Sequence, residues 1–275
     1  MDALMRTIKY IVLLSCLVLN TLYALPVALY STSIPIKSRG RGMRQRAIKR
    51  AMQTVLVRVN GSSWVLENPA IQHELRKASH YVERFDYRPI KPSKQQTKAK
   101  FMLNVKFDPI LMNRLLKNNQ QTIWGALRPH TLIWFVEQTD HGRMILNASD
   151  TSIITKTLEQ LAKQRGLTII LPMMDLEDLS HISPNVLWSF SKQAIESASE
   201  RYLPDAICVV ILSMTPAGKW HTQWRLFFED KQITWEATHP KITPLIHSGF
   251  ITLGNKLSLY SRELLRQKNT LSLTV

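Results

Sequence analysis

The chain has 275 residues, of which 45% are hydrophobic, and a formal net charge of +16 at pH 7. This length and composition allow one large domain or two small ones with buried cores, and they exclude an intrinsically disordered chain and an all-membrane protein. So large an excess of positive charge attracts anionic partners, such as phospholipid head groups, acidic envelope polymers or nucleic acid.

The start of the chain has the pattern of a secretory signal peptide. Arg6 and Lys9 precede an uncharged run from Tyr10 to Ile36, and Ala24 offers the small residue at which a signal peptidase cleaves. We therefore predict a signal peptide over residues 1–24 and a protein exported to the periplasm.

Seven cations follow the uncharged run and leave an alternative open, because the positive-inside rule places such a flank in the cytoplasm. In that arrangement residues 11–30 anchor the protein in the inner membrane, and its cytoplasmic part binds nucleic acid. In an exported protein the same cations bind an anionic lipid or polymer surface, each contributing about 1 kcal/mol near an anionic membrane. A solvated leader without a ligand is equally compatible with this pattern. The seven cations are Lys37, Arg39, Arg41, Arg44, Arg46, Lys49 and Arg50.

Composition divides the chain after the signal peptide into three further segments. A basic leader comes first, a region of two helices and two strands follows, and the second half alternates strands and helices. The predicted segments are residues 25–43 for the leader, 44–127 for the N-terminal region and 128–275 for a C-terminal α/β domain.

In the N-terminal region, apolar residues recur every three or four positions in two segments, which predicts a pair of packed helices. Apolar and polar residues then alternate in two segments on either side of a polar loop, which predicts two strands. The helices are predicted through Ile48–Val59, stopped near Gly61, and through Ile71–Val82; the strands lie at Phe85–Tyr87 and Phe101–Phe107.

From Thr131 onward, strands alternate with helices and end in a three-stranded meander and a long amphipathic helix. This order predicts a mixed α+β and α/β fold, in which helices cover a mixed sheet. The strands are predicted at Thr131–Val136, Leu167–Leu171, Ala206–Met214, Lys219–Phe228 and Gln232–Glu236, and the helices at Ser152–Arg165, Pro184–Arg201 and Ile246–Leu264.

Four polar residues stand directly before a proline and are predicted to cap helices, because the side chain accepts a free backbone N–H and proline at the first helical position loses no bond. These residues are Asn68, Asp108, Ser183 and Thr243. Two glycines, Gly249 and Gly254, are expected to weaken the last helix by about 1 kcal/mol each.

Several apolar residues of the second half are expected in its core. Trp220, Trp224 and Trp235 lie in the meander and are predicted to be buried under the last helix. Cys208 lies in an apolar strand and reads as a small buried hydrophobe. Since the other cysteine, Cys16, lies in the signal peptide, Cys208 has no disulfide partner in the mature chain.

No metal-site, phosphate-loop or hydrolase motif is present, so we predict no metal, no cofactor and no catalytic residue. One acidic group follows the predicted strand that ends at Leu171: Asp175, Glu177 and Asp178. At the carboxyl edge of a sheet these side chains can bind a cation or serve as acid and base, which keeps open an enzyme acting on an anionic envelope polymer. The simpler interpretation is a solvated loop that pairs with a cation and caps the next turn.

Several stretches resemble one bacterial family. They are Arg46–Gly61, Ala78–Tyr87, Phe107-Asp108, Trp124-Gly125, Arg128-Pro129, Trp134, Arg165-Gly166, Pro172, Asp175, Ala198-Ser199, Arg201-Tyr202, Asp205, Gly218–Trp220 and Trp224. The family is catalogued as domain of unknown function 2066, and the resemblance implies an exported envelope protein without supplying catalytic residues. The second half is also similar to the small α/β modules of TolB-type N-terminal domains, which implies work with an envelope protein. Our prediction is a non-enzymatic binding or assembly factor with a basic surface.

Overall fold

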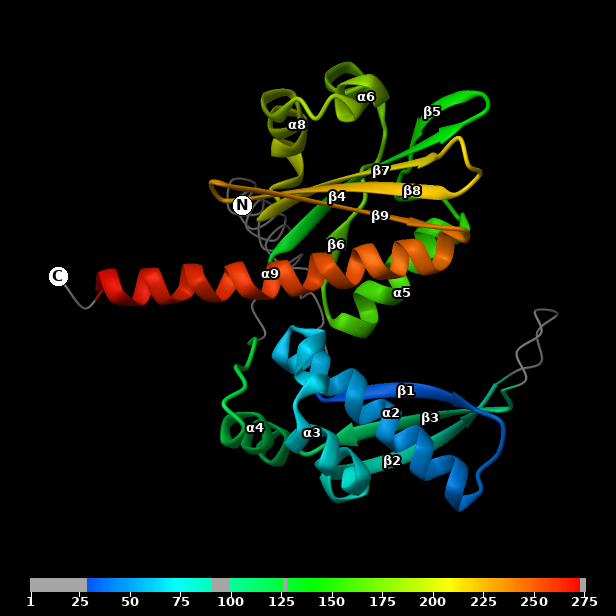
Figure 1. The fold of residues 1–275 in the computed structure, drawn as a ribbon, viewed down its shortest axis with the longest axis vertical. Helices are drawn as coiled ribbons and strands as arrows, with labels where there is room; N and C mark the ends of the chain where they lie inside the picture. Colours follow the sequence, from blue (N-terminus) through cyan, green and yellow to red (C-terminus); the bar gives the residue numbers. More distant parts are fainter. Residues whose placement is uncertain (1–28, 91–98, 126–127, 273–275) are drawn as a thin grey trace, which may run out of the picture.

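The structure, a computed structural model, describes residues 29–90, 99–125 and 128–272. These residues form two β-sheets, each with its own apolar core (Figure 1). We call residues 29–125 the N-terminal unit and residues 128–272 the C-terminal unit. The predicted signal peptide and its cleavage site at Ala24 lie outside the described residues.

The N-terminal unit is a three-stranded antiparallel sheet with helix α2 on one face. The strand order is β1-β3-β2, and alternate side chains of the central strand, among them Leu103 and Val105, are buried against Met52 and Val55 of α2. The elements are β1 (Ser31–Ile36), α2 (Arg41–Asn60), η1 (Ser63–Glu67), α3 (Pro69–Glu74), η2 (Leu75–Tyr81), β2 (Val82–Pro89), β3 (Phe101–Phe107) and α4 (Pro109–Asn118).

Residues 31–36 of the basic leader predicted over residues 25–43 form strand β1, and α2 begins at Arg41, so part of this segment belongs to the folded N-terminal unit. Strand β1 pairs with β3 along its whole length, and Ile34 and Ile36 are buried toward α2. Pro35 is tolerated because β1 is an edge strand, where the missing N–H interrupts no inner hydrogen bond. This strand was not predicted because its short alternation of apolar and polar residues is the last part of the longer uncharged run Tyr10–Ile36.

The first predicted helix is confirmed as α2, which ends at Gly61 in the left-handed region, with φ 87°. The second is shorter than predicted. It consists of α3 and the 3-10 helix η2, with non-helical backbone at Lys77, and Val82 already belongs to β2. Helix α2 packs against β1 of the sheet and, on its other side, against η1 and η2.

The C-terminal unit has a mixed six-stranded sheet. Strand β4 is parallel to β6 and β7, whereas β5, β8 and β9 pair antiparallel to their neighbours in the order β5-β4-β7-β8-β9. The strands are β4 (His130–Thr139), β5 (Gly142–Ile145), β6 (Thr168–Ile170), β7 (Ala206–Met214), β8 (Trp220–Phe228) and β9 (Lys231–His239). The helices are α5 (Ile153–Arg165), α6 (Leu176–His181), α7 (Pro184–Trp188), α8 (Lys192–Ser199), η3 (Glu200–Tyr202) and α9 (Ile242–Ser272).

Helices cover both faces of this sheet, so the predicted fold class is confirmed. Helices α5 and α9 lie on the face that includes Phe135 and Trp224, and they separate the sheet from the N-terminal unit (Figure 1). Helices α7 and α8 lie on the face that includes Trp134 and Val209. The helix predicted over Pro184–Arg201 is broken into α7, α8 and η3, and Phe190 turns the chain between the first two with φ 54°.

Three of the four predicted caps are confirmed: the side chains of Asn68, Asp108 and Ser183 accept backbone N–H groups at the starts of α3, α4 and α7. The cap at Thr243 is wrong. Helix α9 begins at Ile242, so Thr243 already lies in its first turn.

The burial predicted for the tryptophans of the meander is confirmed for Trp224, whereas Trp220 and Trp235 are only partly buried against the same core. Trp224 is 1% exposed beneath α9 and stacks on Trp235, with ring centroids 5.6 Å apart. Cys208 is fully buried, and its burial raises the pKa of the thiol well above its usual range. The glycines of α9 have a packing role that the sequence did not indicate. A Cβ on Gly249 would lie 2.3 Å from Trp224, and one on Gly254 would lie 2.3 Å from Arg165 Nε.

Three buried arginines join the two units. The C-terminal ends of α2 and α5 meet at this junction, where the last carbonyl groups of each helix have no partner within the helix. Arg58 Nε donates to the carbonyl of Gln164 at 2.9 Å, and Arg165 Nη2 donates to the carbonyl of Gly61 at 2.8 Å. Arg128 bridges both ends, because its Nη2 donates to Arg58 O at 2.6 Å and its Nη1 to Arg165 O at 3.1 Å.

The electrostatics of this junction are unusual, because like charges are buried together. Burial lowers the pKa of all three arginines to about 10, and for Arg128 the charges of Arg58 and Arg165 contribute as well. The negative ends of two helix dipoles compensate part of this charge. Arg128 also lies 4.2 Å from the Trp124 ring centroid, a cation–π distance.

Among the described residues, no helix combines the length and the apolar composition that a membrane crossing needs.

Candidate anion-binding surface

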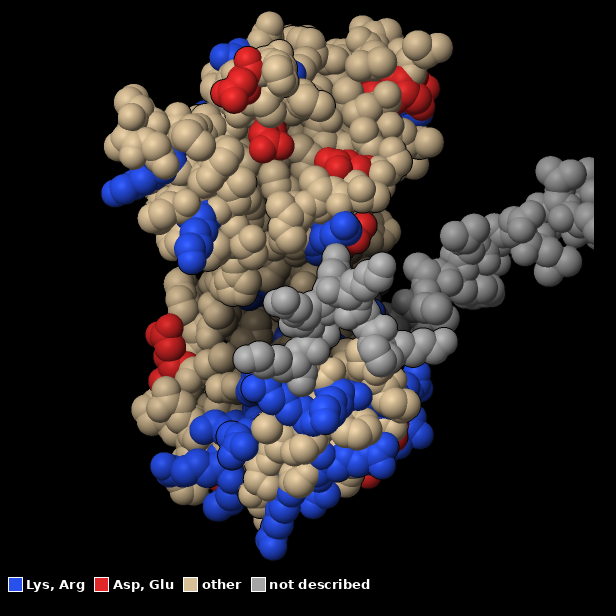
Figure 2. All heavy atoms as spheres, turned by 90° about the vertical axis from the view of Figure 1, so that its right-hand side faces the viewer, with Lys and Arg blue, Asp and Glu red and all other residues tan. Residues whose placement is uncertain are grey.

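The positive charge of the chain is concentrated in the N-terminal unit. Residues 26–125 contain 19 lysines and arginines against 5 aspartates and glutamates, an excess of 14, whereas residues 128–275 contain 15 against 14. Figure 2 shows the same separation, with Lys and Arg side chains gathered over the N-terminal unit and acidic side chains mostly on the C-terminal unit. The net charge is therefore a property of one unit and not of the whole surface.

The structure brings the seven predicted cations to one end of this unit. Lys37 and Arg39 lie in the loop before α2, and the other five lie on the first half of that helix. None of the seven has a hydrogen-bonded or ion-paired carboxylate among the described residues. Six of them are exposed, and Arg44 is half-buried.

Strand register adds two cations that sequence reasoning missed. Ile36 pairs with Phe101, and Phe101 pairs with Pro89, so the end of β1, the start of β3 and the end of β2 lie together. Lys100 is thereby placed beside the loop that precedes α2, because its N–H donates to Ile36 O at 2.9 Å. Arg88 lies at the same end of the sheet, on the far side of β3, and its Nε is 3.7 Å from Asp86 Oδ1. Once the pairing of the strands is known, their terminal residues identify this cluster. We call the nine residues Lys37, Arg39, Arg41, Arg44, Arg46, Lys49, Arg50, Arg88 and Lys100 the basic end.

Aromatic rings position two of these cations. The Arg39 guanidinium lies 4.5 Å from the ring centroid of Phe101 and 5.4 Å from that of Tyr87. Arg44 lies 5.4 Å from the ring centroid of Phe85, which is 43% exposed. The rings hold these guanidinium groups without neutralising their charge.

The local placement of the cations opposes helix stability. The first turn of α2 holds no acidic residue, and its N-cap Gly40 offers no side-chain hydrogen bond. Positive side chains at a helix N-terminus are unfavourable, because that end of the helix dipole is itself positive. An anion bound from outside the protein would therefore relieve the repulsion between these cations and the N-terminus of α2.

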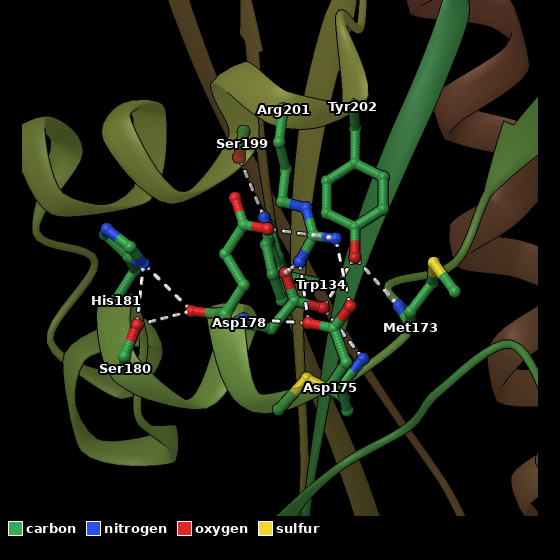
Figure 3. Close-up of polar contacts among 11 residues, drawn as sticks. Trp134, Met173, Asp175, Asp178, Ser180, His181, Ser199, Arg201 and Tyr202 are labelled. Atoms are coloured by element: carbon green, nitrogen blue, oxygen red, sulfur yellow. Dashed lines mark hydrogen bonds and ion pairs between the residues drawn. The ribbon is translucent and has the colours of Figure 1, made fainter.

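The acidic group of the C-terminal unit is organised around Arg201 (Figure 3). Both Nη atoms bind Asp175, at 2.7 and 2.9 Å, and Nη1 also donates to Asp178 Oδ1 at 3.0 Å. Glu177 completes the group at 3.4 Å from Nη2. The structure therefore brings the three predicted carboxylates together, but around a cation of the protein itself.

Asp178 is fully buried, and its second oxygen is also occupied. Oδ2 accepts the hydroxyl of Tyr202 at 2.5 Å and the N–H of Met174 at 2.7 Å. Burial, together with this bond, raises the pKa of Tyr202 to about 12, so the hydroxyl remains a donor at neutral pH. Asp175 also caps α6 by accepting the N–H of Asp178.

A histidine is near this group but does not join it. His181 Nδ1 lies 2.8 Å from the backbone carbonyl of Glu177 and 2.9 Å from Ser180 Oγ (Figure 3). Among the described residues, no group of three or more His, Cys, Asp or Glu side chains is arranged to hold a metal ion. The three carboxylates thus have the arrangement expected of a loop that pairs with a cation, Arg201, and caps the following turn, the start of α6.

The Arg201 ion pair gives stability a defined dependence on pH. The hydrogen bonds from Arg201 hold the pKa of Asp175 well below its usual range. A carboxylate with a depressed folded-state pKa stabilises the fold above its unfolded pKa of about 4, and this contribution is lost as the pH falls toward the folded value. We expect Asp175→Asn to lower the melting temperature at pH 7 and to have a shrinking effect below pH 4. Thermal melts across this range test it, with Asp140→Asn on an exposed turn as the control; an equal effect at every pH would contradict the prediction.

Residues 26–125 match the model of a family described as Domain of unknown function (DUF8605). This match covers the unit that carries the basic end. It also corrects the resemblance to domain of unknown function 2066, because the family whose model matches is a different one. No curated protein and no solved structure matches this sequence, so the likeness of the second half to TolB-type modules stays a prediction.

Proposed function

We propose that this protein is an exported, non-enzymatic binding protein that attaches to an anionic phospholipid surface of the envelope through the basic end of its N-terminal unit. The observation that carries the proposal is the separation of charge: an excess of 14 positive charges in residues 26–125, beside a unit that is almost neutral. The signal-peptide pattern of residues 1–24 supports the export part of the proposal.

The exposure of the cations favours a broad surface over a small ligand. They lie on a helix, a loop and two strand ends, and the seven of residues 37–50 are not paired with carboxylates among the described residues. Near an anionic membrane each such charge contributes about 1 kcal/mol, and the attraction falls off over a Debye length of about 8 Å at physiological salt. Several cations at one end can therefore act together on a flat anionic surface.

The charge separation also implies an orientation. The C-terminal unit has nearly equal numbers of acidic and basic residues, so an anionic surface neither attracts nor repels it strongly. The partly exposed Phe85 lies beside Arg44 and offers an aromatic ring to the lipid interface, where such rings are favoured. In this arrangement the C-terminal unit points away from the surface and remains available to other envelope components.

Vesicle binding tests the proposal. We expect the mature protein to co-sediment with vesicles of mixed zwitterionic and anionic phospholipid but not with purely zwitterionic vesicles. Replacing Arg39, Arg41, Arg44 and Arg46 by Gln should weaken binding by up to about 4 kcal/mol, close to a thousandfold at low salt. Thermal melts should show no large loss of stability, because two of these cations oppose the dipole of α2.

A matched control separates the basic end from net charge. Replacing Lys156, Lys163, Lys192 and Lys219 by Gln removes the same charge from exposed positions of the C-terminal unit and should leave vesicle binding within a few-fold of wild type. Equal losses in both variants, or unchanged binding in the first, would remove the proposal. Tighter binding to a random DNA duplex than to anionic vesicles at the same salt would favour the nucleic-acid alternative.

The compartment is tested separately. Sequencing the N-terminus of the mature protein should give Leu25, which is the residue after Ala24. An intact Met1, or activity of a reporter fused after Val275 only in the cytoplasm, would instead favour the anchored, cytoplasmic alternative.

A further inference from the structure

One hollow of the C-terminal unit lies on the sheet face that points away from α9. Side chains of β8 and β9 form its floor, and Phe190 from the turn between α7 and α8 lies at its wall. Its volume is about 370 Å³, which is within the range of small-molecule sites. Apart from Trp224 and Trp235, which belong to the core on the α9 side of the sheet, the lining residues are Phe190, Gln223, Arg225, Thr234 and Glu236.

Arg225 is the distinctive group of this hollow. Its guanidinium lies 3.9 Å from the Phe190 ring centroid, yet it has no hydrogen bond or ion pair with any described residue, and its Nε is buried without an acceptor. Burial lowers the pKa of Arg225. A partly buried guanidinium with unsatisfied donors is unfavourable unless something else supplies the acceptors.

A second arginine on the same side of the sheet, Arg143, has the hydrogen-bond acceptors that Arg225 lacks in the described part of the chain. Arg143 lies 3.8 Å from the Trp188 ring centroid, so its stacking resembles that of Arg225. Unlike Arg225, it donates from Nε to Gln138 at 3.1 Å and from Nη1 to Asn185 at 2.8 Å. The protein therefore supplies hydrogen-bond acceptors to the guanidinium of Arg143, whereas the guanidinium of Arg225 faces the hollow without an acceptor among the described residues.

The backbone at Phe190 supports the same interpretation. Its φ of 54° lies in the left-handed region, which is unfavourable for a bulky side chain. This conformation is what places the ring against the Arg225 guanidinium at the wall of the hollow.

Glu236 narrows the class of ligand. Arg225 pairs across the strands with Thr234, and Gln223 pairs with Glu236, so Arg225 and Glu236 are diagonal neighbours on one face. Such neighbours are about 7–8 Å apart at Cα, within reach of long side chains. Glu236 Oε2 also lies 3.6 Å from Nε2 of His221, which is not one of the residues that line the hollow. Within the lining, one guanidinium and one carboxylate leave the walls close to neutral, which disfavours a dianion such as phosphate.

We propose that this hollow binds a small zwitterion of the amino-acid class, with its carboxylate on the Arg225 guanidinium and its ammonium group toward Glu236. A planar carboxylate can form two parallel hydrogen bonds with a guanidinium group. Gln223 and Thr234, which also line the hollow, offer further hydrogen-bonding groups. The site is separate from the basic end and does not depend on the membrane proposal.

Nuclear magnetic resonance of arginine Nε–H groups tests the site directly. We expect glycine to shift the Arg225 signal saturably, with acetate weaker and inorganic phosphate weakest. Arg225→Gln should abolish the signal and weaken glycine binding by about tenfold or more in calorimetry. Glu236→Gln should weaken glycine but leave acetate unchanged, because only glycine carries the ammonium group.

The control is Arg143→Gln, which removes a stacked arginine that already has acceptors and should leave glycine binding unchanged. Because Arg225 has no hydrogen bond to lose, Arg225→Gln should melt near the wild-type temperature, which excludes misfolding as the cause of lost binding. The absence of a saturable glycine shift in wild type, or tighter binding of phosphate than of glycine, would overturn the proposal.

Discussion

Replacing Arg128 by methionine is expected to lower the free energy of unfolding by about 2–4 kcal/mol. The change removes the hydrogen bonds to Arg58 O at 2.6 Å and to Arg165 O at 3.1 Å, and it leaves these helix-end carbonyls buried without that donor. It also relieves repulsion from Arg58 and Arg165, which is why we expect less than the full sum of the lost bonds.

Denaturant unfolding measures this effect, and Arg128→Lys serves as the comparison. Lysine keeps the charge and the repulsion, but its single ammonium group cannot bridge two helix ends as a planar guanidinium does. We therefore expect Arg128→Lys to be destabilised at least as much as the methionine variant. A methionine variant more stable than wild type would show that repulsion among the three arginines outweighs their hydrogen bonds.

Replacing Gly249 by alanine is expected to destabilise the protein by about 1–3 kcal/mol, although alanine is the better helix former by about 1 kcal/mol. The new Cβ would lie 2.3 Å from a ring atom of Trp224, which is held between α9 and Trp235 and has little room to move. Helix α9 must then lift from the sheet or the tryptophan pair must shift.

Gly42→Ala is the matched control, because Gly42 is also helical and a Cβ there would meet nothing closer than 3.7 Å. It should be neutral or slightly stabilising in the same thermal melts. A double-mutant cycle with Trp224→Leu should recover part of the loss at Gly249. Full loss in the double variant, with no coupling between the two sites, would contradict this account of the close contact.

Local signals in the sequence predicted most of the elements. The Asn68-Pro69 and Asp108-Pro109 pairs marked helix starts, and the alternation of Phe101–Phe107 marked a strand, because each depends on hydrogen bonds or side-chain faces within a few residues. Strand β1 and the break at Phe190 could not be predicted in this way. The first depends on pairing with β3 far along the chain, and the second on how two short helices pack over one sheet face.

The candidate surface was predicted only in part. The cations of residues 37–50 were evident because they are consecutive in sequence, whereas Arg88 and Lys100 join them only through strand register. For the acidic group, the sequence showed the members of the cluster but not the cation that they bind. Its composition suggested free carboxylates, but Arg201, distant in sequence, occupies them. The partner of a charged side chain is a tertiary property that no local pattern encodes.

The arginine junction has a consequence for how the molecule unfolds. The end of α2 receives donors from Arg128 and Arg165, and the end of α5 receives donors from Arg58 and Arg128. Each unit therefore completes the helix termination of the other, and opening one exposes unsatisfied carbonyls in both. The range that matches the family model, residues 26–125, ends at this junction. We therefore expect the two sheets to gain and lose their structure together in a single transition.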